Sequence, residues 1–255
     1  MHWIQSTKNE KVKRWKKLLT KKGRERSGQF LVEGEHLVEE AHQAGVISEL
    51  IVSKRYRGKL EQIASQYDTY EISREVEKVI SDTETPQGIF AVCRQFSVQK
   101  EANGKRFLLI DAVQDPGNIG TMIRTADAAG IDLVILGEGC ADLYNPKVLR
   151  AAQGSHFHIP VQTGNLIEWI ERFHQKQIPV YGTAFNGAVP MKDVQTGGPF
   201  ALIVGNEGKG VDQKLLSRTT KNLYIPIYGK CESLNVAVAT GILMYYLRGG
   251  AEEYA

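Results

Sequence analysis

The chain has 255 residues, of which 42% are hydrophobic and 24% charged, so its composition is that of a packed globular protein and not of a disordered, collagenous or coiled-coil one. No apolar run reaches the ~18–20 residues that a membrane-spanning helix needs, and the first residues lack the apolar core of a signal peptide. We therefore expect no membrane association. The three cysteines lie far apart without a CxxC pair, which argues against a zinc site and predicts reduced thiols and a cytoplasmic location.

Positive charge is concentrated at the start of the chain. Residues 1–30 hold ten Lys or Arg against two Glu, a net charge of +8, whereas the whole chain is only +3. Val12, Trp15 and Leu19 recur at helical spacing, which predicts a helix with one apolar stripe and cations on its other faces. This asymmetry is typical of a segment that meets an anionic partner, although a solvated basic face is the alternative. The candidate residues for contact with such a partner are Lys13, Arg14, Lys16, Lys17, Arg24 and Arg26.

The next elements predict a small α/β domain over residues 1–96. Short apolar runs at 30–32, 50–52 and 89–92 alternate with helical stretches at 35–44 and 60–67. A polar stretch at 97–105 then separates two apolar regions, and we interpret it as a linker.

The remaining residues, 106–255, predict a second α/β domain. Continuous apolar runs at 107–110, 133–136, 180–183 and 201–204 alternate with helical segments. Such runs are typical of a parallel sheet that helices cover on both faces. Ligands of open α/β sheets bind at the carboxyl ends of the strands, so the loops that follow these runs are the candidate functional segments.

The first candidate loop, at 111–130, opens a helix whose inward stripe we expect to contain Met122, Ala126 and Ala129. At 3.6 residues per turn, Arg124 lies about 200° around this helix from Met122 and should face away from the core. A plain surface arginine is the alternative interpretation.

Two further loops are rich in small or polar residues. The segment at 205–210, Gly-Asn-Glu-Gly-Lys-Gly, lets backbone N–H groups approach a ligand, but it matches neither a Walker A loop nor a dinucleotide fingerprint. The segment at 224–239 precedes a helix that is apolar almost all round, with Ser233 as the expected N-cap. Such a helix needs burial on every side, either in a subunit interface or in the centre of the monomer.

His156 and His158 alternate about Phe157 in a predicted strand, so both would point to one face. No third metal ligand lies nearby in the sequence, and we expect no metal site.

Together the three loops resemble the motifs of SpoU (TrmH-type) RNA 2′-O-ribose methyltransferases of the SPOUT superfamily. They read DPxNxGxxxRTAxxxG at 115–130, GNEGxG at 205–210 and IPxxGxxxSLNVxxA at 225–239. The resemblance covers roughly residues 106–250. The first domain is similar, on weaker features around residues 23–34, to the ribosomal-protein-like RNA-binding domain often fused to these enzymes.

The resemblance implies a parallel-sheet SPOUT domain with a deep trefoil knot, S-adenosylmethionine (AdoMet) as the methyl donor, no metal, and a homodimer through the C-terminal domain with composite active sites. By motif match, the cofactor-binding residues are Thr183, Ala184, Gly205, Ile225 and Leu234. The catalytic or RNA-contacting residues are Asn118, Arg124, Glu207, Ser233 and Asn235.

Arg124 is the residue that the resemblance links to activation of the ribose 2′-hydroxyl. Arginine stays protonated in proteins, so we interpret it as a cation that stabilises the developing alkoxide and holds the neighbouring phosphate. Asn118 and Asn235 would position the ribose and the arginine through neutral hydrogen bonds.

The expected function is therefore AdoMet-dependent methylation of a ribose 2′-hydroxyl in structured RNA. Ribosomal RNA is favoured over tRNA only by analogy with the first domain. A tRNA ribose methyltransferase, a non-catalytic RNA-binding protein and a nucleotide-dependent enzyme of Rossmann type are the alternatives.

Overall fold

The computed structural model describes residues 2–96 and 104–249. The chain forms two compact units, one made of Met1–Phe96 with Asp142–Phe157 and the other of Ser97–Ala141 with His158–Ala255. Most of the linker expected at 97–105 lies outside the described residues. No helix within the described ranges is long and apolar enough to cross a membrane.

The N-terminal unit is built on a mixed five-stranded sheet of order β1-β4-β3-β5-β2. Strands β1, β4 and β3 run parallel, whereas β5 is antiparallel to both β3 and β2. The strands are β1 (His2–Ile4), β2 (Gln29–Glu33), β3 (Ile47–Ser53), β4 (Asp68–Ile72) and β5 (Ile89–Arg94). The edge strand β1 is only three residues long.

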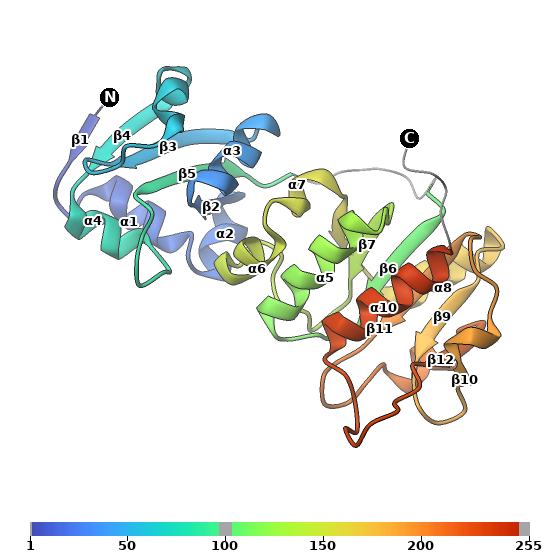
Figure 1. Cartoon of the computed structure of the whole chain (residues 1–255). Coiled ribbons are helices and arrows are strands. Elements are labelled where there is room, and N and C mark those ends of the chain that lie inside the picture. The colour runs from blue at the N-terminus through green and yellow to red at the C-terminus, as the bar shows by residue number, and fades with distance from the viewer. Residues whose placement is uncertain (1, 97–103, 250–255) are drawn as a thin grey trace. The chain divides into compact units, whose positions relative to one another are not determined.

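Helices cover both faces of this sheet (Figure 1). One apolar cluster joins α1 and α4 to Ile51 and Phe90, and the other joins α3 to Leu50 and Ala91, as the alternation of side chains along a strand requires. The helices of this unit are α1 (Glu10–Lys17), α2 (Lys21–Ser27), α3 (Glu35–Gln43), η1 (Lys59–Gln66), α4 (Arg74–Ile80) and α6 (Pro146–Ala152). The small α/β architecture expected for the first domain is confirmed.

The apolar stripe expected on α1 packs into the core of its unit. Val12 and Trp15 are fully buried, and Leu19, just after the end of the helix at Lys17, is half-buried against the same apolar cluster. Leu18, one turn after Trp15, is also buried and was not part of the expected stripe.

The C-terminal unit is built on a seven-stranded sheet of order β10-β12-β9-β11-β6-β7-β8 in which every pairing is parallel. Its strands are β6 (Arg106–Ile110), β7 (Leu133–Leu136), β8 (Val161–Thr163), β9 (Val180–Thr183), β10 (Val189–Pro190), β11 (Phe200–Val204) and β12 (Lys221–Tyr224). The four apolar runs singled out from the sequence are β6, β7, β9 and β11, and the parallel sheet is confirmed.

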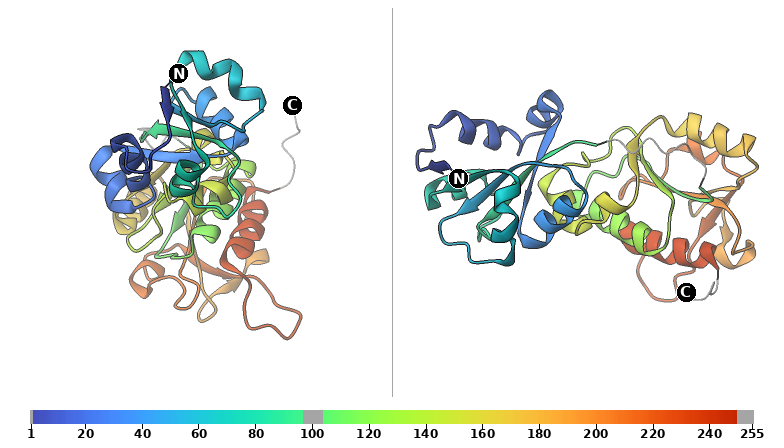
Figure 2. Two further views of the ribbon diagram at one scale, coloured as in Figure 1. Left: turned by 90° about the vertical axis from the view of Figure 1, so that its left-hand side faces the viewer. Right: turned by 90° about the horizontal axis from the view of Figure 1, so that it is seen from above.

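Alternate residues of β6 and β11 face two helical layers. Phe107, Leu109 and Ile203 pack with α8 (Leu166–Gln175) and α9 (Gln213–Leu216). The opposite layer contains α5 (Pro116–Ala128) and α10 (Val236–Arg248), which pack against each other, as the green and red helices in Figure 2 show. Gly241 lets α10 approach α5 closely, since a Cβ there would lie 3.3 Å from Thr125 Cγ2.

The prediction of a strand around His156 and His158 is wrong. Residues Ser155–His158 form a short helix, α7, in which His156 is buried and packs at 4.0 Å, centroid to centroid, against Phe157. His158 Nδ1 lies 3.0 Å from Asp127 Oδ2. The two rings therefore do not share one face. A short 3-10 turn, η2 (Met191–Asp193), completes the regular elements of the described residues.

Candidate active site

Four neighbouring strands of the parallel sheet bring the motif loops to one edge. β12, β9, β11 and β6 are adjacent in that order, and Val204 at the end of β11 pairs with Ile110 at the end of β6. Parallel strands end at the same edge, so the loops that begin at Asp111, Ala184, Gly205 and Ile225 lie at one side of the sheet. The chain order also reverses between β6 and β11, which is the position where open α/β sheets bind ligands.

Asp115 starts helix α5. Its carboxylate accepts a 2.8 Å hydrogen bond from the N–H of Asn118, and Pro116 occupies the first turn, where a missing N–H costs nothing. The buried stripe of Met122, Ala126 and Ala129 is confirmed.

Arg124 is exposed, as its position on α5 predicts. Among the residues that the structure describes, Arg124 forms neither an ion pair nor a hydrogen bond. Its charge is therefore available to an anionic ligand.

Asn206 shapes the loop after β11, which sequence reasoning did not single out. Its Oδ1 accepts hydrogen bonds from the N–H groups of Gly208 and Lys209 at 3.0 and 3.1 Å. Its Nδ2 donates at 2.9 Å to the carbonyl of Ala112, which has the positive φ of 50° that non-glycine residues rarely adopt. One side chain thus folds the second motif and ties it to the first.

Gly205 is required for the shape of its own loop. A Cβ at this position would lie 2.2 Å from Val211 N and 2.3 Å from the carbonyl carbon of Gly210. The glycine therefore allows the loop to close on its own backbone, where Asn206 and Gly210 exchange hydrogen bonds of 3.0 and 2.9 Å. This role in loop closure is an additional reason for a glycine here, and its place in the cofactor site stays a prediction.

The N-cap of α10 is Asn235, not Ser233. Asn235 Oδ1 accepts from the N–H groups of Ala237 and Val238 at 2.9 and 3.3 Å, whereas Ser233 is exposed and precedes the helix. Both residue types cap helices well, so the sequence alone did not decide between them.

One hydrogen-bonded chain joins all three motifs. Asn235 Nδ2 donates to Asn118 Oδ1 at 3.0 Å, and Asn118 Nδ2 donates to Glu207 Oε1 at 3.0 Å. A carboxylate only accepts, and Asn235 Oδ1 is already taken by the helix N-terminus, so the orientation of both amides is fixed. We call Asn118, Glu207 and Asn235 the amide–carboxylate chain.

Among the described residues, the other candidate residues form no hydrogen bond with the amide–carboxylate chain. Arg124, Ser233 and Leu234 are exposed. Thr183, Ala184 and Ile225 are half-buried where β9 and β12 end, and the Ala184 N–H donates to the Leu223 carbonyl at 3.1 Å. The loop that carries Ser233 and Leu234 projects from the body of its unit (Figure 1).

Asp111 is a further residue at this edge that the sequence did not mark. Its Oδ2 accepts a 2.8 Å hydrogen bond from the N–H of Asp212, which connects the end of β6 to the segment after the glycine loop. Burial raises the pKa of the Asp111 carboxyl, the Asp212 N–H lowers it, and the nearby Asp212 charge raises it further, with a net increase.

The structure removes Arg24 from the candidate RNA contacts. It is 2% exposed, and its guanidinium donates to Asp142 Oδ2 and to the Leu18 carbonyl, both within the N-terminal unit. Arg14 is half-exposed and paired with Glu49, whereas Lys16, Lys17 and Arg26 are exposed. Lys13 is also exposed and lies 2.6 Å from Glu10.

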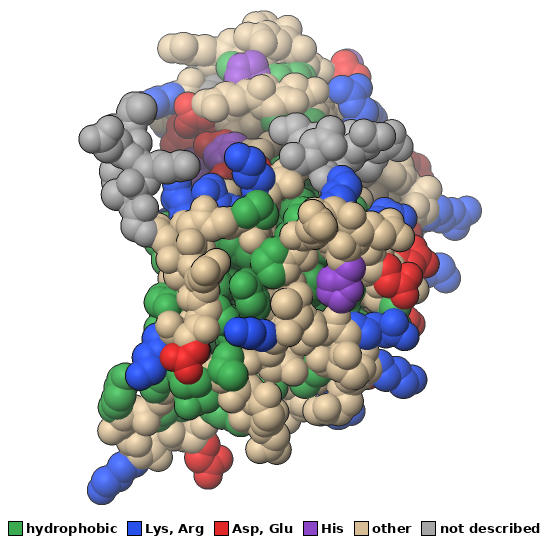
Figure 3. All heavy atoms as spheres, turned by 90° about the vertical axis from the view of Figure 1, so that its right-hand side faces the viewer, with side chains coloured by type: hydrophobic (Ala, Val, Ile, Leu, Met, Phe, Trp, Pro, Cys, Tyr) green, Lys and Arg blue, Asp and Glu red, His purple; other side chains and the backbone are tan. Residues whose placement is uncertain are grey.

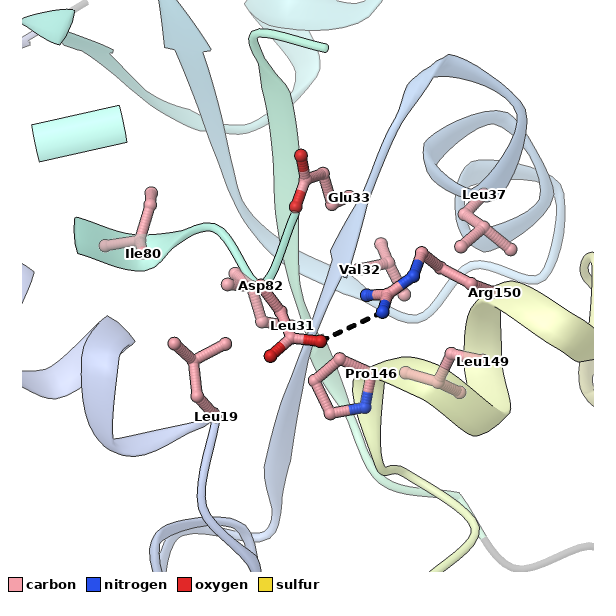
Figure 4. A pocket seen from close by; sticks show the side chains of 10 residues that line it. All are labelled: Leu19, Leu31, Val32, Glu33, Leu37, Ile80, Asp82, Pro146, Leu149 and Arg150. Atoms are coloured by element: carbon pink, nitrogen blue, oxygen red, sulfur yellow. Dashed lines mark hydrogen bonds and ion pairs between the residues drawn. The ribbon is translucent and has the colours of Figure 1, made fainter. Parts of the chain in front are cut away.

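A hollow in the N-terminal unit has no motif residue in its wall (Figure 4). Arg150 donates to Asp82 Oδ2 at 2.9 Å across it, and its other walls are mainly apolar. The lining residues are Leu19, Leu31, Val32, Glu33, Leu37, Ile80, Asp82, Pro146, Leu149 and Arg150. No group of three His, Cys, Asp or Glu placed to hold a metal ion occurs among residues 2–96 and 104–249.

Comparison with known families identifies both parts of the chain. The SpoU rRNA Methylase family matches residues 105–245, and the MRM3-like substrate binding domain matches residues 9–91. The chain belongs to the SpoU rRNA methylase family. The family and the α/β fold that the motifs predicted are thus confirmed.

Relatives of this SpoU-family chain include ribosomal RNA enzymes. It is 52% identical over 254 residues to the 23S rRNA (guanosine(2553)-2′-O)-methyltransferase RlmP of Bacillus subtilis, covering 98% of this chain and 100% of that protein. It is 28% identical to the human mitochondrial rRNA methyltransferase 3, covering 90% of this chain and 70% of the relative.

Solved structures of similar enzymes match nearly the whole chain. The AdoMet-bound rRNA methyltransferase from Sinorhizobium meliloti has a TM-score of 0.86 at 31% identity, covering 96% of this chain and 97% of that one. The SpoU methyltransferase AviRb from Streptomyces viridochromogenes, in complex with AdoMet, has a TM-score of 0.86 at 26% identity, covering 94% and 97%.

Proposed function

We propose that this protein transfers a methyl group from AdoMet to a ribose 2′-hydroxyl of ribosomal RNA. The single observation that carries the proposal is the amide–carboxylate chain, because it joins side chains from all three SpoU motifs at the sheet edge where ligands bind. The 52% identity to RlmP over the full length supports a guanosine of the large-subunit rRNA as the target.

The residues at the ends of β9, β11 and β12 suit AdoMet. Half-buried Ile225 and exposed Leu234 offer apolar surface for an adenine ring, and the loop at 205–210, which Asn206 holds in shape, lies at the same sheet edge. Thr183 and Ala184 lie on the neighbouring strand end. When bound, AdoMet supplies an already activated methyl group on a sulfonium, so no metal is required.

The residues of the protein itself have two roles in the reaction. The amide–carboxylate chain holds Glu207 and Asn118 in fixed orientation toward the ribose, and fixed positioning can supply ~7–11 kcal/mol of the barrier reduction in such reactions. Arg124 provides an unpaired cation that binds the RNA phosphate and stabilises the charge that develops on the 2′-oxygen as its proton leaves.

A homodimer through the C-terminal unit would bring these two groups together. Val238, Ile242 and Tyr245 form an exposed apolar stripe on α10, with exposed fractions of 53%, 37% and 50%. Figure 3 shows one side of the molecule, with apolar side chains at the surface among charged ones. Since α10 packs on α5, a partner that covers the stripe would approach the helix that carries Arg124. We propose a composite site, with Arg124 from one protomer facing the amide–carboxylate chain of the other.

The remaining expectations become part of the same proposal. Residues 106–255 would form the catalytic domain with the trefoil knot of the superfamily, apart from Asp142–Phe157, which pack with the N-terminal unit. Residues 1–96 would form the RNA substrate-binding domain. We propose a cytoplasmic location, where the ribosomal RNA of a bacterial cell is found.

Mapping of ribose methylation tests the function. Ribosomal RNA and tRNA from a strain that lacks the gene should be compared with wild-type RNA by a method that detects 2′-O-methylation. We expect one missing methyl group, at the guanosine of 23S rRNA that corresponds to the RlmP target. The purified enzyme with AdoMet should restore it. Loss of a tRNA methyl group instead would favour the tRNA alternative, and no change in either would contradict the proposal.

Sedimentation of the full-length protein tests the dimer. We expect a dimer for the wild type and a monomer for Ile242→Glu, because a charge would then be placed in the apolar stripe. Exposed Lys192 on the same unit gives the matched control, and Lys192→Glu should remain dimeric. An active wild-type monomer would contradict the composite site.

A further inference from the structure

Trp3 is exposed on the edge strand of the N-terminal unit. The residue is 50% exposed, whereas the other two tryptophans of the chain, Trp15 and Trp169, are buried. An exposed indole is a large apolar and aromatic surface that folding does not use. Neither the SpoU motifs nor the match at residues 9–91 includes it.

Aromatic rings and cations alternate along this edge. On one face of β1, exposed His2 stacks on Tyr70 with ring centroids 5.5 Å apart, and Lys11 Nζ lies 4.3 Å from the Tyr70 centroid. Side chains alternate along a strand, so Trp3 points to the other face. There Lys54 Nζ lies 5.7 Å from the Trp3 ring centroid.

The loop that carries Lys54 is basic and held in shape. Arg57 donates to the carbonyls of Lys54 and Tyr56 at 2.8 and 2.7 Å, and Arg55 donates to Glu77 at 2.8 Å. Within the described ranges, Lys54 has no carboxylate partner. A cation available for a phosphate therefore lies beside the exposed ring.

We propose that Trp3 stacks on an unpaired base of the RNA substrate while Lys54 binds an adjacent phosphate. This inference rests on the proposed function and adds a contact that distinguishes unpaired from paired RNA. A base must leave its duplex to stack on an aromatic side chain, and such stacking tolerates any base. Lys54 beside the ring favours an anion over a neutral peptide, because the cation on the other face, Lys11, is paired with Glu49. A three-residue strand also offers little backbone for strand addition.

Intrinsic fluorescence of the full-length protein measures the stacking directly. A short oligouridylate, which stays single-stranded, should quench the emission of Trp3, while a blunt RNA duplex of equal length should not. Trp3→Phe should remove the quenching, because Trp15 and Trp169 are buried, yet keep most of the affinity.

Affinity and kinetics complete the test. Trp3→Ala should weaken oligouridylate binding about 5- to 150-fold without changing the salt dependence, while Lys54→Ala should weaken binding and also flatten that dependence. Methyl transfer to rRNA should show a higher KM with kcat unchanged in Trp3→Ala, because stacking far from the reacting atoms is uniform binding. Thermal unfolding of each variant should match the wild type, since both side chains are exposed.

Two outcomes separate this inference from the proposed function. If the wild type methylates rRNA but Trp3→Ala binds and turns over RNA like the wild type, or if the duplex quenches equally, the stacking contact is wrong and the function stands. If the wild type neither binds nor methylates rRNA, the proposed function is wrong and the stacking inference falls with it.

Discussion

Asn118 Nδ2 donates a 3.0 Å hydrogen bond to Glu207 Oε1, and this contact joins the start of α5 to the loop after β11. The opposite end of the Asn118 amide accepts from Asn235, so neither amide can rotate without breaking a hydrogen bond. Three loops that are distant in sequence therefore adopt one arrangement before substrate binds, which is the condition for catalysis by positioning.

Asn235 has two roles, as the N-cap of α10 and as a member of the amide–carboxylate chain, and two substitutions distinguish them. Asn235→Asp keeps an oxygen that caps α10 but places a carboxylate oxygen against Asn118 Oδ1. We expect methyl transfer to fall about 10- to 100-fold while the free energy of unfolding stays within ~0.5 kcal/mol of the wild type. Asn235→Ala should lower the free energy of unfolding as well, by ~1 kcal/mol, because the cap is removed. Single-turnover kinetics and urea unfolding measure the two effects. An Asn235→Asp variant with wild-type activity would contradict the catalytic role of the amide–carboxylate chain.

Arg124 should act on RNA and the transition state without affecting the cofactor. Because its guanidinium is exposed and outside the amide–carboxylate chain, Arg124→Ala should abolish detectable methyl transfer and leave AdoMet affinity unchanged. Arg124→Lys keeps the charge but not the planar fork, so we expect only partial recovery. Calorimetric titration with AdoMet, paired with single-turnover kinetics, checks both parts. Substantial turnover by the alanine variant would remove Arg124 from the mechanism.

Gly205 controls the shape of the loop proposed to hold AdoMet. In Gly205→Ala the new Cβ would meet backbone at 2.2 Å, so the loop must move, and we expect AdoMet affinity to fall at least tenfold, or about 1.4 kcal/mol. Gly208→Ala is the matched control, because its Cβ would meet Asn206 Oδ1 at an ordinary 3.7 Å. Calorimetry should show nearly wild-type affinity for the control, and a chelator should change neither value. Equal affinities in both variants would place the cofactor elsewhere.

The fold was predictable where one physical cause dominates the local sequence. Central strands of a parallel sheet are buried on both faces and leave continuous apolar runs, which is why residues 107–110 and 133–136 were assigned correctly. Arg124 was placed on the outer face of α5 by helical geometry alone. The trefoil knot that we propose has no such local signal, because a knot is a property of how a chain is threaded.

The predictions from sequence were wrong where a residue distant in the chain determines the position of a side chain. Arg24 looks like its exposed neighbours in sequence, but its partner Asp142 is 118 residues away, and this ion pair buries it. Ser233 and Asn235 are equally good caps by residue type. The residue that caps the helix, Asn235, is also the one that contacts Asn118, 117 residues away. Long-range contacts of this kind leave no periodicity for sequence reasoning to detect.

Glu49 makes the stability of the N-terminal unit depend on pH. Burial alone would raise the pKa of its carboxyl, but hydrogen bonds from Arg14, Trp15 and Lys11 outweigh burial and hold the pKa below its ordinary value. The folded state thus favours the carboxylate. Its contribution is complete above about pH 4.3, the usual pKa of a free Glu, and is lost as the pH falls through the lower folded value.

We therefore expect Glu49→Gln to lower the free energy of unfolding by ~1–3 kcal/mol at neutral pH and to reduce its acid dependence. Urea unfolding at neutral pH and at a series of acidic pH values gives both quantities. Exposed Glu25 lies on the neighbouring α2, and Glu25→Gln should behave like the wild type. Parallel curves for Glu49→Gln and wild type would show that the carboxyl is not linked to folding.

Substitutions in the basic N-terminal segment should distinguish cations that bind RNA from cations that stabilise the fold. Lys16 and Lys17 are exposed on α1, so their replacement by Ala should weaken RNA binding and reduce the slope of log affinity against log salt by up to ~0.7 for each phosphate that is no longer neutralised. Arg24→Ala should instead destabilise the fold, because it leaves Asp142 and the Leu18 carbonyl without their guanidinium donor. AdoMet affinity should be unchanged in the lysine variant. Lys192→Ala, on the other unit, controls for charge removal alone. RNA affinity measured at several salt concentrations tests the role of these lysines. Identical slopes for the wild type and the lysine variant would mean that α1 only presents a solvated basic face and that RNA is bound elsewhere.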